Sequence, residues 1–168
     1  MVVAIIGHRK VQEKESLVER IYDTVTELIE NDGADTFLFG SRSEFNNLCY
    51  IVVTEIQKIF PHIRRVYVRA ERDYDNVEHL LDFYEETYFP DRVRGANELC
   101  YVLRNGIMIE LCDVLLTYCD NNYEPPRKSA KNKMLAPVFE NQKPKSGTQM
   151  AVQVAKRRRK RVINLFEK

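Results

Sequence analysis

The sequence predicts an α/β fold of three layers, in which helices cover both faces of a central, mostly parallel five-stranded sheet. Residues 2–6 are a continuous apolar, largely β-branched run that ends at a glycine, as expected for a strand buried on both faces of a parallel sheet. Further short apolar runs alternate along the chain with longer segments of helical periodicity. The 168 residues have the length of one domain, and we expect a single domain over 1–168.

The first half of the chain alternates strand and helix up to residue 70. Leucine, isoleucine and valine recur at helical spacing in both predicted helices. Gly33 ends the first helix and Pro61 ends the second. We predict strands at residues 2–6, 36–39 and 63–70 and helices at residues 13–31 and 43–60.

The alternation resumes near residue 100 and adds two more strands. We predict helices at residues 101–112 and 147–159 and strands at residues 113–118 and 162–166. Parallel strands in one sheet are joined by right-handed crossovers, and in this pattern the crossovers are the helices that cover the sheet.

Two insertions interrupt the pattern at about residues 71–99 and 121–145. The first holds nine acidic residues among its aromatic ones, and we expect it to form a helix and a lid. Its aromatic side chains either pack a small additional core or stack on a ligand. The second contains four prolines, which predicts a long loop with little regular structure. Loops of this length inside a domain are usually either functional or mobile.

Composition and cysteine spacing exclude several classes of protein. The chain is 44% hydrophobic and 30% charged, as in soluble globular proteins and unlike collagen-like or disordered chains. No run reaches the roughly 18 apolar residues of a membrane span and no signal peptide precedes the first strand, so we expect a cytoplasmic protein without a membrane partner. The four cysteines form no CxxC pair and have no histidine at zinc-ligand spacing, which predicts reduced thiols and no metal site.

Charge is distributed unevenly along the chain. Residues 1–120 carry 13 basic and 22 acidic side chains, whereas residues 121–168 carry 13 basic and 3 acidic ones. The basic run at residues 156–161 could follow a nucleic-acid backbone. Its place at the end of a predicted helix favours the alternative, in which the cations complement the helix dipole and remain solvated. We therefore expect no nucleic-acid partner.

Glycine, hydroxyl, amide and arginine groups follow the predicted strands and open the last helix. Sheets of this kind bind ligands at the carboxyl ends of their strands. Glycine lets the backbone approach a phosphate, the free N–H groups of a helix start attract an anion, and arginine adds a forked charge. The candidate residues at this edge are Gly7, His8, Arg9, Gly40, Ser41, Arg42, Arg104, Asn105, Ser146, Gly147 and Thr148.

These residues predict a nucleotide-like small molecule as the ligand, and no cofactor. Each glycine taken alone also fits an ordinary turn between elements. His8 either contacts the ligand or is a hydrogen-bonded structural residue, and Arg104 is either a contact or a surface arginine.

Four segments together resemble the SLOG superfamily: residues 7–9 (GHR), 39–46 (FGSRSEFN), Arg104-Asn105 with Asp113 beyond them, and residues 144–148 (PKSGT). This superfamily includes the DNA-processing protein DprA, the LOG phosphoribohydrolases and small bacterial proteins of the YpsA and YoqJ type, which this chain resembles most. The resemblance covers nearly the whole chain. It implies a Rossmann-like domain that binds a nucleotide or an ADP-ribose-like ligand, with Phe45 and Asn46 joining the site.

The chain departs from the family's pattern at positions that bear on catalysis. Many relatives carry GGAxGFD in the second loop, so Glu44 stands at a usual glycine and Asn46 at the usual aspartate. LOG enzymes carry a glutamate three residues after the threonine of GGxGTxxE, where this chain has Ala151. Cleavage of an N-glycosidic bond needs a correctly placed carboxylate, and Glu44 is the candidate catalytic residue that remains.

Two classes of function follow from these observations. The first is the binding or sensing of a nucleotide, which the missing glutamate favours. The alternative is an enzyme that cleaves the N-glycosidic bond of a nucleotide, like the LOG phosphoribohydrolases or the nucleoside deoxyribosyltransferases. A DNA-binding, DprA-like protein is a further alternative, and a homo-oligomer is compatible with all three.

Overall fold

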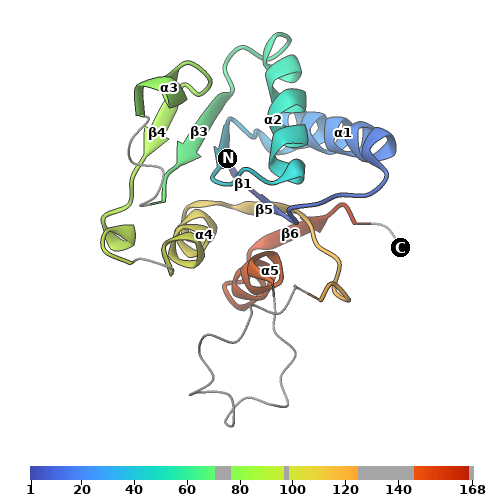
Figure 1. Ribbon diagram of the computed structural model, residues 1–168. Coiled ribbons are helices and arrows are strands. Elements are labelled where there is room, and N and C mark those ends of the chain that lie inside the picture. The colour runs from blue at the N-terminus through green and yellow to red at the C-terminus, as the bar shows by residue number, and fades with distance from the viewer. Residues whose placement is uncertain (71–76, 97–98, 125–145, 167–168) are drawn as a thin grey trace.

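The computed structural model describes residues 1–70, 77–96, 99–124 and 146–166, and an all-parallel sheet forms its centre. Within these residues the sheet has six strands in the order β4-β3-β2-β1-β5-β6 (Figure 1). The strands are β1 (Val2–Gly7), β2 (Thr36–Phe39), β3 (Arg64–Val68), β4 (Glu86–Tyr88), β5 (Val114–Tyr118) and β6 (Arg161–Asn164).

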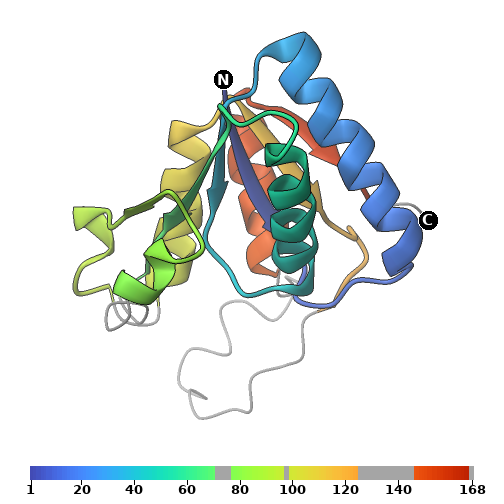
Figure 2. The same ribbon diagram turned by 90° about the horizontal axis from the view of Figure 1, so that it is seen from above.

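Helices cover both faces of this sheet, as predicted. They are α1 (Lys14–Asp32), α2 (Glu44–Gln57), α3 (Val77–Leu81), α4 (Cys100–Leu111) and α5 (Gly147–Arg157), with a 3₁₀ helix, η2 (Asp91–Val93), before α4. α1 and α2 lie on one face, and α4 and α5 lie on the other (Figures 1 and 2). This arrangement is a Rossmann-like α/β fold, which confirms the predicted fold class. Of the helices in the described part of the chain, none combines the length and the apolar character that a membrane crossing requires.

The sixth strand, β4, lies inside the first predicted insertion and is an addition to the five strands predicted. It pairs with β3 at the edge of the sheet, from Val66↔Glu86 to Val68↔Tyr88. Three residues are too few to show the two-residue alternation by which longer strands are predicted. α3 is the helix expected in this insertion, whereas residues 125–145 of the second insertion lie outside the described residues.

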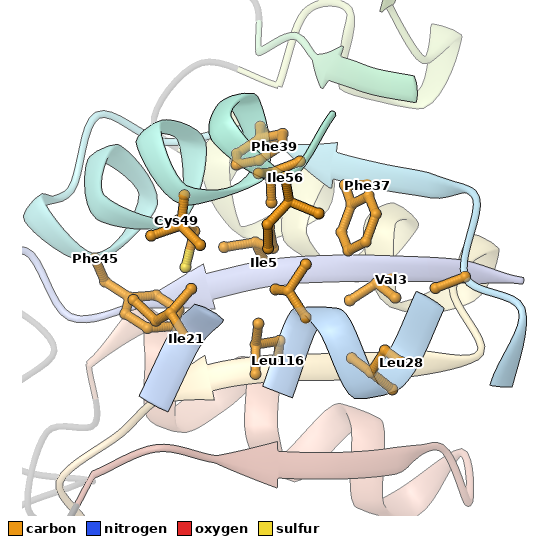
Figure 3. Close-up of a cluster of buried hydrophobic side chains, with 14 of the residues drawn as sticks. Val3, Ile5, Ile21, Leu28, Phe37, Phe39, Phe45, Cys49, Ile56 and Leu116 are labelled. Atoms are coloured by element: carbon orange, nitrogen blue, oxygen red, sulfur yellow. The ribbon is translucent and has the colours of Figure 1, made fainter. Parts of the chain in front are cut away.

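Alternate residues of each central strand contribute to two separate apolar layers. Val3 and Ile5 of β1 pack with residues of α1 and α2 on one face, where side chains from helices and strands point into a common layer (Figure 3). Ala4 and Ile6 pack with residues of α4 and α5 on the other face. Burial of both faces explains why β1 is apolar throughout. All four cysteines are buried and free, as predicted.

The two neighbours of β1 pair with it over different lengths. Pairing with β2 extends only to Ala4↔Leu38, whereas pairing with β5 continues to Gly7↔Tyr118. The chain passes from β1 to β2 on one side and from β5 to β6 on the other, so the strand order reverses between β1 and β5. In open parallel sheets this is the position at which ligands bind.

The start of α2 fills the space left where β1 and β2 separate. Asn46 Nδ2 donates a hydrogen bond of 3.0 Å to the carbonyl oxygen of Ile5, which lies beyond the last β1–β2 pair. The Phe45 ring covers Gly7 so closely that a Cβ atom at residue 7 would lie 2.5 Å from the ring Cγ. Gly7 is therefore required by packing against α2.

Substitution of Gly7 by alanine tests this packing, with Gly106 of α4 as the matched control. A Cβ at residue 7 would overlap Phe45, so Gly7→Ala is expected to lower the free energy of unfolding by about 1–3 kcal/mol. A Cβ at residue 106 meets no atom within 4 Å, and Gly106→Ala is expected to raise that free energy by about 0.5–1 kcal/mol. Urea unfolding followed by circular dichroism measures both values. Equal effects of the two substitutions would contradict the packing role of Gly7.

Candidate functional site

All strands of the described sheet end at one edge, here termed the carboxyl edge. It comprises the loops that follow β1, β2 and β5 and the first turn of α5. The predicted residues 7–9, 40–46 and 146–148 all belong to it, and Arg104 reaches it from α4. The structure thus brings to one edge four segments that are far apart in the sequence.

Two serines and an asparagine hold the loop after β2. Ser43 caps α2, because its Oγ accepts a hydrogen bond of 3.1 Å from the backbone N–H of Asn46. The hydroxyls of Ser41 and Ser43 both donate to Asn46 Oδ1. Since the amide of Asn46 donates to Ile5, this network fixes the loop to β1. Ser41 and Asn46, predicted as ligand contacts, have structural bonds here, and Ser43 is an additional residue that the prediction missed.

Gly40 is required by the approach of a side chain from α4. A Cβ at residue 40 would lie 2.8 Å from both Arg104 Nε and Met108 Sδ. Arg104 is only 2% exposed, and its guanidinium donates at 3.0 Å to Asn105 Oδ1 and lies 5.4 Å from the centre of the Tyr101 ring. Arg104 is therefore a buried arginine within α4 that reaches the carboxyl edge, and Asn105 orients it.

Glu44, the candidate catalytic residue, holds the loop after β1 against α2. Its Oε2 accepts a hydrogen bond of 3.0 Å from the backbone N–H of Val11, and its Oε1 lies 3.3 Å from Lys10 Nζ. Its own backbone N–H donates to the carbonyl oxygen of Arg9 at 3.0 Å. The hydrogen bond from Val11, together with Lys10 and Lys14, lowers the pKa of Glu44. Its carboxylate is thus held in the ionised form.

His8 joins the loops after β1 and β5 across the position where the strand order reverses. Its Nε2 accepts a hydrogen bond of 2.9 Å from the backbone N–H of Asp120, so the proton of the neutral ring is on Nδ1. The ring is 5% exposed and lies 4.5 Å from the Tyr123 ring. Burial lowers the pKa of His8, although the carbonyl oxygen of Asp120, 3.4 Å from Nε2, and the Asp120 carboxylate act to raise it. His8 therefore has a structural hydrogen bond through Nε2, and its Nδ1–H remains as a donor.

Gln149 connects the first turn of α5 to the loop after β5. Ser146 and Gln149 form a capping box, in which the serine Oγ accepts from the glutamine backbone N–H and Gln149 Oε1 accepts from that of Ser146. The Nε2 of Gln149 lies within 3.2 Å of the carbonyl oxygens of Asp120, Asn121 and Tyr123. The prediction missed Gln149, although the Ser-x-x-Gln spacing is the sequence signal of this motif.

Four donor groups at the carboxyl edge have no acceptor among the described residues. The backbone N–H groups of Gly147 and Thr148 open α5, and a Cβ at residue 147 would meet open space. The exposed guanidinium groups of Arg9 and Arg42 form no hydrogen bond or ion pair within the same residues. All of these groups favour an anion.

Two aromatic residues of the first insertion, Tyr84 and Phe89, pack against the rest of the domain. Tyr84 lies 5.2 Å from both Tyr50 and Tyr67, and Phe89 packs in a small cluster beside α4. Tyr88 is exposed. Phe89 thus belongs to a small additional core, whereas Tyr84 packs against the main core beside α2.

The basic run lies at the opposite edge of the sheet, where β6 begins. Arg158 lies 2.7 Å from Glu110, and Arg161 lies 2.5 Å from Asp32. Two cations of the basic run thus pair with carboxylates of the same chain. Their place after the last turn of α5 agrees with the alternative in which these cations complement the helix dipole.

No group of three or more histidine, cysteine, aspartate or glutamate side chains in the described ranges is arranged to hold a metal ion. Comparison with protein-family models and with curated protein sequences gives no match for this chain. The function of the carboxyl edge is therefore inferred from its own groups.

The buried ring of His8 predicts a loss of stability in mild acid. Because the folded state lowers the pKa of His8, the unfolded state binds the proton first as the pH falls below the ordinary value of about 6.5. The free energy of unfolding is therefore expected to fall between about pH 7 and pH 5. His8→Gln keeps an acceptor for the Asp120 N–H and should remove part of this fall, whereas His62→Gln at an exposed position should not. Urea unfolding at several pH values measures it, and an unchanged pH dependence in His8→Gln would exclude His8 as its source.

Proposed function

We propose that this chain binds or senses a nucleotide or a nucleotide-derived, ADP-ribose-like ligand at the carboxyl edge. One observation carries the proposal: the first turn of α5, with the unused N–H groups of Gly147 and Thr148, is tied by Gln149 to the loop after β5. The same loop is joined through His8 to the loop that carries Arg9. Donors for an anion therefore surround the position where the strand order reverses.

Electrostatics favours a phosphate group among the anions. The N-terminus of a helix carries a partial positive charge and presents N–H groups in the direction of the ligand. Arginine binds phosphate through two parallel hydrogen bonds, which a fixed loop can orient. Arg9 and Arg42 follow the neighbouring strands β1 and β2 and supply such groups.

The resemblance to the SLOG superfamily supports the same ligand class, and we propose that the chain belongs to it. The segments that carry the resemblance, residues 7–9, 39–46 and 144–148, lie at or lead into one edge of the Rossmann-like fold. The first part of the last segment lies outside the described residues.

Binding without cleavage is the form of this function that the side chains favour. Glu44 is ionised and occupied by the N–H of Val11 and by two lysines, so it does not offer the proton that a departing base needs. The position at which LOG enzymes carry a glutamate is Ala151, which packs in the apolar layer between the sheet and α5. An N-glycosidase needs a free carboxylate, and the described residues 7–9, 39–46 and 146–148 contain none.

Titration calorimetry with AMP, ADP and ADP-ribose tests the proposal. We expect at least one of them to bind, and Arg42→Ala to weaken binding by about 1.5–3 kcal/mol, the range for a lost hydrogen bond to a charged group. Arg157→Ala is the matched control, since Arg157 is an exposed arginine at the end of α5 on the opposite edge. It should leave the affinity unchanged.

Two outcomes would contradict the proposal. If none of the three nucleotides binds, the carboxyl edge is not a nucleotide site. If Arg42→Ala and Arg157→Ala have equal effects, binding occurs elsewhere. Chromatography of the same incubations should recover the nucleotide intact, and release of free base that Glu44→Gln abolishes would establish the enzyme alternative instead.

A further inference from the structure

Four arginines at the amino-terminal edge of the sheet have carboxylate partners. At the amino-terminal edge, Arg65 pairs with Glu85 at 2.5 Å, and this pairing holds the pKa of Glu85 at about 2 against the effect of burial. Arg64 pairs there with Glu86 at 3.4 Å. Arg158 and Arg161 at the same edge also have carboxylate partners.

At the carboxyl edge, each of three adjacent strands is followed by an arginine without a carboxylate partner among the described residues. Arg9 follows β1 by two residues, Arg42 follows β2 by three, and Arg69 follows β3 by one. β1, β2 and β3 are neighbours in the sheet. Paired strands lie about 4.8 Å apart, so β1 and β3, on either side of β2, are roughly 10 Å apart where they pair with it. Arg69 was not among the residues predicted from the sequence.

Arg69 is held in place but is short of an acceptor. Its backbone N–H donates to the carbonyl oxygen of Tyr88 at 2.8 Å, and its guanidinium lies 5.4 Å from the centre of the Phe89 ring. Its Nε is buried and has no hydrogen-bond partner among the described residues. A buried donor of a charged group without an acceptor is unfavourable. The two terminal nitrogens of the same guanidinium are not among the buried atoms without a partner, and they are the donors that a ligand can reach.

A second guanidinium lies near the same ring. Arg94 lies 5.9 Å from the centre of Phe89, so two positive charges share one aromatic ring. Arg42 follows β2, the strand next to β3. Like charges gathered in this way favour a bound anion between them.

The donors in this row are spread along the edge of the sheet. A phosphate group at the reversal between β1 and β5 would lie two strands away from β3, the strand that Arg69 follows. The N–H groups of Gly147 and Thr148 with Arg9 already match one phosphate at the reversal between β1 and β5. Arg42 and Arg69 extend the row away from it, across β2 and β3.

We infer that the ligand carries a pyrophosphate, as a nucleoside diphosphate or an ADP-ribose-like molecule does, and that Arg69 with Arg42 binds its second phosphate group. This inference rests on the proposed function and names its ligand class. It also assigns Arg69 as the residue that distinguishes a diphosphate from a monophosphate.

Calorimetric titration of AMP and ADP into wild-type protein and Arg69→Gln tests the inference. We expect wild-type protein to bind ADP about tenfold more tightly than AMP, because the second phosphate adds charge-assisted hydrogen bonds. Arg69→Gln should lose about tenfold in affinity for ADP and change affinity for AMP by less than about twofold. Inorganic pyrophosphate should compete with ADP more strongly than inorganic phosphate does.

Two further variants provide the controls. Arg69→Lys keeps the positive charge but removes the paired N–H groups of the guanidinium. It should therefore lose less affinity for ADP than Arg69→Gln does. Arg157→Gln at the opposite edge should leave both affinities unchanged, and thermal melting establishes that each variant is folded.

The outcomes separate the inference from the proposed function. Equal affinities of wild-type protein for AMP and ADP, or an equal loss of both in Arg69→Gln, would overturn the pyrophosphate inference and leave nucleotide binding intact. Absence of binding of both nucleotides to the wild-type protein would overturn both.

Discussion

The carboxyl edge depends on the unequal pairing of β1. This strand stays hydrogen-bonded to β5 as far as Gly7 but leaves β2 after Ala4. The space that opens is closed by α2, through the hydrogen bond from Asn46 to Ile5 and the Phe45 ring on Gly7. Once α2 is fixed there, its first residues hold the loop after β1, and that loop reaches β5 through His8. One continuous set of backbone-anchored contacts thus orders loops that have no regular structure of their own.

The same contacts explain why some polar groups are available and others are not. Ser41, Ser43, Asn46 and Glu44 have their hydrogen-bonding capacity directed at the loops, which makes them positioning residues. Positioning in turn leaves the α5 N–H groups, the guanidinium groups of Arg9 and Arg42 and the Nε of Arg69 without acceptors among the described residues. A protein that needs arginine only for stability pairs it as Arg65 is paired with Glu85. The contrast between the two edges is therefore the physical basis of the proposed site.

Most of the fold follows from sequence pattern, since strands buried on both faces and amphipathic helices leave strong periodic signals. β2 begins and ends at the predicted residues, and β4 was missed because three residues carry no period. The glycines show why less of the site than of the fold could be predicted. A turn glycine predicts that another group comes close to the backbone, but only the fold reveals that Phe45 approaches Gly7 and that Arg104 approaches Gly40. Arg69 was missed for a related reason, because its significance lies in the absence of the carboxylate partner that Arg64 and Arg65 of β3 have.

The most direct test of the central claim is the change in backbone amide resonances when ADP is added to ¹⁵N-labelled protein. The account predicts the largest changes at Gly147, Thr148 and Arg9, around the reversal between β1 and β5, with smaller ones along the row toward Arg69. Amides at the amino-terminal edge, such as those of Asp35 and Lys160, should not move. Changes centred on the amino-terminal edge, or changes that leave Gly147 and Thr148 unaffected, would contradict the claim that the carboxyl edge is the ligand site.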